Sequence, residues 1–364
     1  MKPVIVVWLE WPEKCFRIDA GALRRLRELA PKGARVVRVR SERSFLRELP
    51  RATHALVWNF RSEWFERAPN LKVLATPAAG REFVPEQGPK GVRIHFGHFH
   101  GAIMAESVQA FLFAWARGFF RPELKEFPWP RTELSDKCYR VAGTRAVIAG
   151  FGNVGRAIGR KLEENGVAVT GYTRHGLYFG AGEEDAPFST RDRNVASPLH
   201  TSNKGHATFL SRDNKGDTTF FPCDNKGDAT FLSREKRNFS TAFSRALFRA
   251  DWLILALPST TGTDNFLDAK LLAKLPRRAV VVNVGRGNAV DERALYNALA
   301  SHRIAGAYLD VRCHEPSATV LEAPGYVPEL TELPNCIVMP HASAFDAGYL
   351  TAFIDELAKE GCLK

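Results

Sequence analysis

Residues 145–155 read Arg-Ala-Val-Ile-Ala-Gly-Phe-Gly-Asn-Val-Gly. The run 145–149 predicts a buried strand, and a helix is predicted to follow it and to end at Gly166, a natural C-terminal stop. Between the two stand three glycines at the spacing G-x-G-x-x-G: Gly150, Gly152 and Gly155. The first permits a tight turn, the second lets the backbone approach a pyrophosphate, and the third lets helix and strand pack closely. In this context the spacing indicates a dinucleotide-binding unit, whereas the spacing alone would also suit a plain glycine-rich turn.

The residues after this unit bear on which dinucleotide would bind. We expect the helix start, at Asn153 and Val154, to favour the phosphate charges. The next predicted strand, 167–172, leads into Thr173 and Arg174 with no Asp or Glu. An acid at this place usually binds the ribose 2′-hydroxyl of NAD, and its absence removes the repulsion of a 2′-phosphate that Arg174 could clamp. We therefore expect NADP in preference to NAD. The alternative is that Arg174 is a solvated loop residue and NAD binds.

Strands and helices alternate on both sides of the glycine-rich stretch, which predicts parallel α/β sheets. Strands are expected at 4–10, 34–39, 55–58, 73–76, 91–96, 252–257, 279–283, 306–309 and 336–339, and helices at 20–30, 41–49, 268–275 and 291–302. A longer helix is expected at 102–120, where the side chains are apolar on nearly every side, so we expect it to be deeply buried. A proline-rich link follows at 121–131.

Residues 181–240 interrupt this alternation. The tripeptide Asn-Lys-Gly recurs at 203, 214 and 225, each time followed by a Thr-Phe pair. Three short polar copies inside another domain are poor material for a solenoid. We interpret the segment as a low-complexity insertion, disordered or at best loosely hairpinned, with a binding role as the alternative.

Composition excludes several classes of protein. The chain has 364 residues, 45% of them hydrophobic, and a net charge of +11, without any motif that reads a nucleic-acid groove. Its apolar runs are too short to span a bilayer and no signal peptide is evident, so we expect a cytoplasmic protein that binds neither nucleic acid nor membrane. None of the six cysteines forms a C-x-x-C pair, and we expect free thiols and no bound metal.

Four later stretches carry a more specific signal. They are Leu-Ala-Leu-Pro-Ser-Thr-Thr-Gly-Thr at 255–263, Val-Asn-Val-Gly-Arg-Gly at 282–287, Leu-Asp-Val-Arg-Cys-His-Glu-Pro at 309–316 and Met-Pro-His at 339–341. Together and in this order they resemble the D-isomer-specific 2-hydroxyacid dehydrogenase family, and the resemblance covers nearly everything outside 181–240. It implies an NAD(P)-dependent oxidoreductase that interconverts a small 2-keto acid and a D-2-hydroxy acid by hydride transfer.

The resemblance implies three catalytic residues whose chemistry suits that reaction. Arg286 offers a planar fork that can grip a carboxylate and polarise the adjacent keto group. His341 can exchange a proton near neutral pH, and Glu315 would orient its ring and raise its pKa. The substrate carboxylate would also be held by the backbone of Ala78, Ala79 and Gly80. Cofactor contacts are expected from Gly150, Gly152, Asn153, Val154, Gly155, Thr173, Arg174, Pro258, Thr263, Val284, Gly285 and Asp310. Two histidines before the long helix, His98 and His100, are further candidates to face the cleft.

We expect an α/β protein with a Rossmann dinucleotide-binding domain and a discontinuous, flavodoxin-like substrate domain. The substrate domain would comprise 1–105 and 340–364, and the Rossmann domain 106–339, with the insertion at about 181–240. The active site would lie between them, and the family suggests a homodimer with the long helix near the interface.

Three matters stay open at this level. The chain could be a dinucleotide-sensing binding protein, comparable to a corepressor scaffold, although binding alone needs no acid–base pair. It could also be an inactive relative disrupted by the insertion or by a tail after His341 that is short for the family's closing helix. Glyoxylate and hydroxypyruvate fit as substrates, and so do bulkier 2-keto acids.

Overall fold

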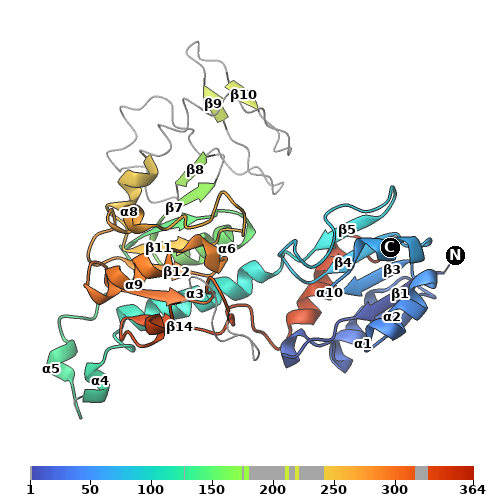
Figure 1. Cartoon of the computed structure of the whole chain (residues 1–364), viewed down its shortest axis with the longest axis horizontal. Helices are drawn as coiled ribbons and strands as arrows, with labels where there is room; N and C mark the ends of the chain where they lie inside the picture. The colour runs from blue at the N-terminus through green and yellow to red at the C-terminus, as the bar shows by residue number, and fades with distance from the viewer. Residues whose placement is uncertain are drawn as a thin grey trace. The chain divides into compact units, whose positions relative to one another are not determined.

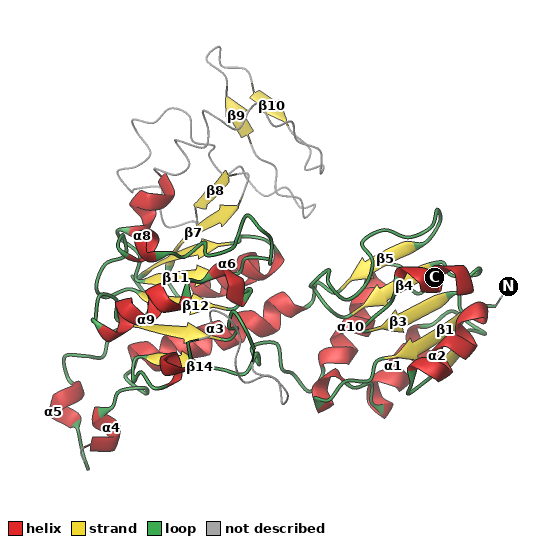
Figure 2. Ribbon diagram, in the orientation of Figure 1, coloured by secondary structure: helices red, strands yellow, loops and turns green. Residues whose placement is uncertain are grey.

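The computed structural model describes residues 2–126, 128–173, 176–179, 210–212, 218–220, 242–315 and 327–364. The chain forms two compact units (Figure 1). The first combines Met1–Met104 with Ala342–Lys364, and the second is Ala105–His341. The α/β class expected from the sequence is confirmed, because each unit is built on its own parallel sheet (Figure 2).

The first unit contains a five-stranded parallel sheet in the order β2-β1-β3-β4-β5, which is the flavodoxin-like order. Its strands are β1 (Val4–Trp8), β2 (Arg35–Arg38), β3 (His54–Val57), β4 (Val73–Thr76) and β5 (Arg93–Phe96). Side chains that alternate along β1 enter different cores, since Ile5 and Val7 pack on one face and Val6 on the other. Helices α1 (Ala20–Leu29) and α10 (Tyr349–Lys359) contribute to the first core and α2 (Glu42–Glu48) to the second.

The helix starts of this unit follow from local sequence. The side chain of Asp19 accepts a hydrogen bond from the amide of Ala22 at the start of α1, and the side chain of Ser41 accepts one from the amide of Ser44 at the start of α2. The tail after His341 is long enough for a closing helix, contrary to the concern raised by its length. Within α10 the side chains of Leu350, Phe353 and Leu357 are at most 3% exposed.

The second unit contains a seven-stranded sheet in the order β14-β13-β12-β11-β6-β7-β8. Its strands are β6 (Arg145–Ala149), β7 (Ala168–Thr173), β8 (Gly176–Phe179), β11 (Trp252–Leu255), β12 (Val280–Asn283), β13 (Gly306–Leu309) and β14 (Cys336–Val338). All neighbours pair in parallel except β7 and β8, which pair antiparallel. The strand order reverses between β6 and β11, and open α/β sheets bind ligands outside the carboxyl ends of the strands at such a point.

Helices of the second unit cover both faces of this sheet. On one face α8 (Ala269–Leu272), α9 (Glu292–Ala300) and a helical stretch at 242–247 share a core with the sheet. On the other face lie α6 (Asn153–Glu164) and α3 (His100–Ala116). Short 3-10 turns occur at Lys14–Phe16, Leu49–Arg51, Ser62–Arg67, Gly287–Ala289 and Pro328–Thr331. Among the residues that the structure describes, no helix is long and apolar enough to cross a membrane.

The long helix α3 spans His100–Ala116, so it begins and ends earlier than its apolar composition suggested. Its burial is also less complete than expected. Trp115 is 8% exposed and packs where a side chain at Gly306 would lie, whereas Phe113 is 37% exposed. The link that follows is not a plain coil, because it contains the short helices α4 (Glu123–Glu126) and α5 (Arg131–Leu134).

Only a small part of the insertion at 181–240 falls within the described residues. That part is an antiparallel hairpin of β9 (Leu210–Arg212) and β10 (Thr218–Phe220), which form a two-stranded sheet of their own. The five cysteines that the structure describes are free, as expected, and Cys223 lies outside the described residues.

Candidate active site

The glycine-rich loop connects β6 to α6 with a geometry that explains two of its glycines. Gly150 has φ +92°, and a Cβ there would collide with the carbonyl oxygen of Ala256 on the neighbouring β11 loop. A Cβ at Gly155 would collide with the carbonyl oxygen of Gly150, so the helix can approach the loop this closely only without a side chain. The amides of Gly150 and Phe151 donate to the carbonyl oxygen of Tyr172, which ties the loop to β7.

Gly152 differs from the other two because a Cβ there would meet no atom of the chain within 4 Å. It is the N-cap of α6, whose first residues are Asn153 and Val154. Open space directly over the amino end of a helix is what a bound phosphate needs, since the first amides of a helix have no partner within it and the dipole favours an anion. The loop therefore fits the pyrophosphate of a dinucleotide.

The end of β7 is where a dinucleotide's adenosine ribose would be recognised. Gly171, Tyr172 and Thr173 complete the strand, and none of them carries a carboxylate. The proposed 2′-phosphate ligand Arg174 lies outside the described residues.

The loop after β11 carries two further residues expected at the cofactor. Pro258 is exposed and Thr263 is partly buried. The hydroxyl of Thr263 lies 2.7 Å from the carbonyl oxygen of Pro258 and 2.9 Å from that of Thr260. Thr263 therefore closes this exposed loop on itself, which is a structural role that its motif did not predict.

Arg286 follows β12 on a tightly held turn. The buried amide of Asn283 accepts a hydrogen bond from the backbone of Gly285 at 3.1 Å and donates one to the carbonyl oxygen of Arg286 at 3.2 Å. A Cβ at Gly285 would lie 2.5 Å from the backbone nitrogen of Leu257, and Val284 is buried at 2% exposure. Asn283 belongs to the predicted motif but was given no role there. An amide at the end of an otherwise apolar strand was the available signal.

His341 and Glu315 form a hydrogen-bonded pair at the end of β14. Nδ1 of His341 lies 2.8 Å from Oε1 and 3.0 Å from Oε2 of Glu315, and the backbone amide of His341 donates to the carbonyl oxygen of Asp310. A carboxylate only accepts, so the hydrogen resides on Nδ1 and Nε2 is left for proton exchange. Each of the two side chains is about half exposed, at 49% for His341 and 48% for Glu315.

The charges around His341 set its proton affinity. The hydrogen bond that His341 donates to Glu315 raises the pKa of His341 above its ordinary value, and the charges of Glu315 and Asp310 add to this effect. Partial burial and the positive charge of Arg286 oppose it without reversing it. The ring is thus held protonated to higher pH, which suits a group that donates a proton to a substrate oxygen.

The glycine-rich loop and the three proposed catalytic residues lie at one edge of the second sheet. Gly150, Arg286 and Glu315 follow the carboxyl ends of β6, β12 and β13, and His341 follows β14, so parallel pairing brings them to the same edge. Ala78, Ala79 and Gly80 belong to the first unit, where they form the loop after β4. The amide of Ala78 donates to the hydroxyl of Thr76.

The two additional histidine candidates belong to the first unit. The ring of His100 is buried at 5% exposure, with Nε2 at 2.7 Å from the hydroxyl of Tyr349. The backbone amide of His98 donates to the carboxylate of Glu356. These contacts join the start of α3 to α10 and indicate a role in packing. No group of three or more metal-ligating side chains occurs among the described residues.

A buried ion pair next to the site had no place in the sequence interpretation. Arg312, in the motif that ends with Glu315, binds Glu292 at the start of α9 through two hydrogen bonds. The available signal in the sequence was a charged residue, Arg312, directly after Asp310 and Val311 at the end of an apolar strand. This pair is taken up below.

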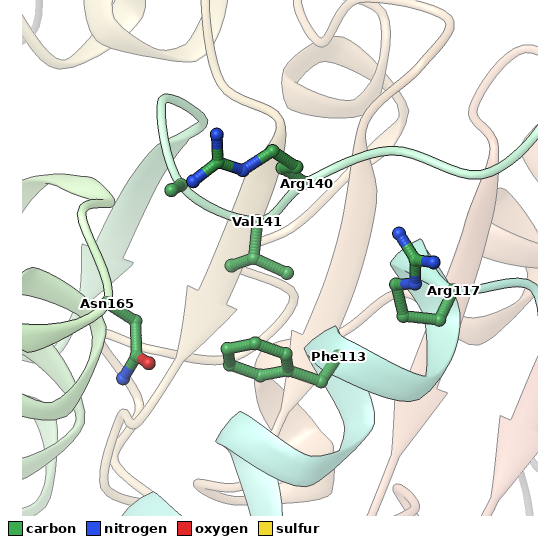
Figure 3. Close-up of a pocket in the computed structure, with 6 residues that line it drawn as sticks. Phe113, Arg117, Arg140, Val141 and Asn165 are labelled. Atoms are coloured by element: carbon green, nitrogen blue, oxygen red, sulfur yellow. The ribbon is translucent and has the colours of Figure 1, made fainter.

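A surface pocket of about 270 Å³ lies elsewhere in the second unit (Figure 3). Its lining residues are Phe113, Arg117, Arg140, Val141, Ala142 and Asn165. Asn165 ends α6, whereas the glycine-rich loop precedes its first residue, and a helix of this length separates its ends by roughly 18 Å. The pocket is therefore not part of the candidate active site.

Comparison with known proteins extends this picture. Residues 223–343 match the model of the "D-isomer specific 2-hydroxyacid dehydrogenase, NAD binding domain" family. The chain is 40% identical over 95 residues to glyoxylate/hydroxypyruvate reductase B of Pectobacterium carotovorum, and this alignment covers 26% of the chain and 28% of the reductase. It is 23% identical over 306 residues to glycerate dehydrogenase of Methylorubrum extorquens, covering 82% and 77% of the two proteins.

The fold is likewise similar to solved structures. An NADPH-dependent glyoxylate/hydroxypyruvate reductase from Sinorhizobium meliloti, in complex with citrate, superposes with a TM-score of 0.60 at 20% identity, covering 98% of this chain and 93% of the other. At this identity the likeness shows a shared two-domain fold.

Proposed function

We propose that this chain is a member of the D-isomer specific 2-hydroxyacid dehydrogenase family, whose NAD-binding-domain model matches residues 223–343, and that it interconverts a small 2-keto acid and a D-2-hydroxy acid with NAD(P) as cofactor. The observation that carries the proposal is the pair of His341 and Glu315, 2.8 Å apart, beside Arg286 and at the same sheet edge as the glycine-rich loop. A protein that only binds a dinucleotide has no need of an acid–base pair there.

Each residue of this set has a distinct task in the proposed reaction. Arg286 binds the substrate carboxylate and polarises the keto oxygen, because a guanidinium offers two parallel donors to a planar anion. Nε2 of His341 donates a proton to that oxygen during reduction and takes it back during oxidation. Glu315 keeps the hydrogen on Nδ1 and stabilises the imidazolium. The bound nicotinamide would supply or accept the hydride.

The cofactor would be held by the second unit. Gly152 and the amino end of α6 would receive the pyrophosphate, while Thr263, Gly285 and Asp310 lie on loops at the same sheet edge. We propose NADP in preference to NAD because β7 ends without a carboxylate and Arg174 follows it in sequence. Ala78–Gly80 would contribute backbone contacts to the substrate carboxylate.

The proposal is tested with purified protein by following oxidation of NADPH and of NADH in the presence of glyoxylate, hydroxypyruvate and bulkier 2-keto acids. We expect turnover with NADPH, and its loss in His341→Gln while NADPH binding, measured by fluorescence, is retained. Tight NADPH binding without turnover of any acid would point to a sensor. Absence of binding of either cofactor would point to an inactive relative.

A further inference from the structure

The pair of Glu292 and Arg312 is almost completely withdrawn from solvent. The Arg312 side chain is 4% exposed and that of Glu292 is 2% exposed. Nε of Arg312 lies 2.8 Å from Oε1 of Glu292, and Nη2 lies 2.7 Å from Oε2, so the guanidinium and carboxylate meet in a two-point contact. Such forked contacts set the orientation of both partners as well as their distance.

The same two side chains also hold backbone. Glu292 accepts hydrogen bonds from the amide of Cys313 at 2.9 Å and from the amide of Val327 at 3.2 Å. Arg312 donates to the carbonyl oxygen of Val327 at 2.8 Å. One carboxylate therefore fixes two points of the chain that lie on either side of Glu315 in sequence.

Stability alone is a weak reason for this arrangement. Removing two charges from water costs several kcal/mol per ion, and apolar side chains of similar volume often fill such a space at no loss of stability. What an apolar pair could not provide is a defined orientation of the backbone at Cys313, two residues before Glu315. The other end of this segment is also fixed, since the amide of Asp310 donates to the carbonyl oxygen of Asn283.

We propose that Glu292 and Arg312 form a positioning element that holds the Glu315 carboxylate against Nδ1 of His341. The inference rests on the proposed function for its consequence, but its geometry does not depend on turnover. The pair acts through the backbone of Cys313, whose amide donates to the Glu292 carboxylate. Burial raises the pKa of the Cys313 thiol to about 12, with a further contribution from Glu292.

The test is the titration of His341, followed by NMR in the unliganded protein. The charged groups that act on this ring are Glu315, Asp310 and Arg286. In Arg312→Met and Arg312→Lys we expect the pKa of His341 to fall toward its ordinary value, because Glu315 is no longer aligned. In the active protein kcat/KM should fall on the order of 10²-fold, with little change in NADPH affinity.

A double variant separates positioning from a general structural effect. In Glu315→Gln the carboxylate next to His341 has been removed. Adding Arg312→Met to this variant should therefore lower the pKa of His341 no further. An additive shift, or a wild-type titration in folded Arg312→Met, would overturn the proposal. Arg293→Ala is the matched control. It breaks the neighbouring exposed pair with Glu329, 3.6 Å apart, and should leave His341 unchanged.

Loss of one partner alone can unfold the protein, since it leaves a buried charge unpaired. Glu292→Gln with Arg312→Met removes both charges and keeps an oxygen that can accept from Cys313 or Val327. We expect this variant to fold and to show the lowered pKa of His341. The titration needs no substrate. If the wild-type protein shows no turnover, the proposed function fails and this inference stands. If the titration of His341 is unaltered in the variants, this inference fails and the proposed function stands.

Discussion

His341 lies in a backbone conformation that few residues other than glycine adopt, with φ +55°. Its amide is bound to the carbonyl oxygen of Asp310, and its ring to Glu315, so contacts from a neighbouring strand end hold the residue in place. Backbone strain of this kind persists only where the surroundings over-determine it, and it is concentrated at functional sites. The direction of the His341 side chain is thus set by β13 as much as by its own strand.

The raised pKa of His341 predicts a pH dependence with a definite sign. Reduction needs the protonated ring, so kcat/KM for a 2-keto acid should be level at low pH and fall as pH rises through the raised pKa. Oxidation of the hydroxy acid should show the opposite trend. Glu315→Gln should move both transitions to lower pH, because the ring then lacks a negatively charged acceptor that stabilises its protonated form. His341→Gln should reduce kcat/KM by roughly 10²- to 10⁴-fold.

The same shift is linked to folding. Its contribution to stability is fully present below the pKa of an unfolded histidine and is lost as pH rises through the folded pKa.

A wild-type rate profile with a midpoint below the ordinary histidine range would contradict the role given to Glu315.

Two glycines of the dinucleotide loop should respond differently to the same substitution. Gly155→Ala places a Cβ against the carbonyl oxygen of Gly150 and should lower the melting temperature. Gly152→Ala meets no atom within 4 Å, so it should leave the melting temperature nearly unchanged and weaken NADPH binding by filling the space a phosphate would use. Calorimetry and fluorescence titration of both variants provide the comparison. Unaltered NADPH affinity in Gly152→Ala would place the pyrophosphate elsewhere.

At the scale of elements, α10 completes the core of the first unit. It is formed by the last part of the chain, yet it packs with α1 and with the β1 side chains Ile5 and Val7. The carboxylate of Glu356 on this helix accepts from the backbone of His98 and lies 2.8 Å from Nε2 of His95. Apolar packing and this partly buried pair together hold the tail against the sheet.

Truncation of Phe353 should therefore destabilise the first unit strongly. The side chain is fully buried, and Phe353→Ala should cost about 3–5 kcal/mol of unfolding free energy, measured by chemical denaturation. Asp355→Ala on the same helix is the control. Its pair with Arg25 is exposed on both sides, so the loss should be small beside that of Phe353→Ala. Equal losses in the two variants would mean that α10 is not part of the core.

At the scale of the whole molecule, four of the large apolar side chains that are exposed lie close together in sequence, between residues 113 and 129. The exposed fractions are 37% for Phe113, 70% for Phe119, 45% for Leu124 and 82% for Trp129. These residues lie on α3 and on the following segment with α4 and α5. Apolar side chains gathered in this way often mark a protein interface. The homodimer that the family resemblance suggests stays a prediction, and these side chains are the place to test it.

We predict that Phe113→Ser with Trp129→Ser shifts the protein from dimer to monomer at micromolar concentration, as measured by light scattering. Central aromatic residues of an interface contribute about 2 kcal/mol or more each, so the loss should be large. Phe248→Ser, at an exposed aromatic outside this region, should leave the mass unchanged. A wild-type protein that is already monomeric would remove the basis for the dimer.

Much of the fold was predictable from local sequence. The strands at 73–76, 145–149 and 306–309 have the predicted bounds, because short apolar runs with polar or glycine boundaries define a buried strand without reference to distant residues. Gly150 and Gly155 were interpretable for the same reason, since their spacing relates a strand to the helix that directly follows it.

Other features depend on segments that are distant in sequence, and only the tertiary structure decided them. Parallel pairing of β12, β13 and β14 brings Arg286, Glu315 and His341 to one edge. The reversal between β6 and β11 creates the switch point there, and β8 runs antiparallel. The sequence by itself determined most of the strands and longer helices and the chemistry of the motif residues, but not the short helices α4 and α5 or the strand β8. The meeting of Glu292 with Arg312, and of α10 with β1, was left to the structure, because burial and hydrogen bonding between remote segments are properties of the packed chain.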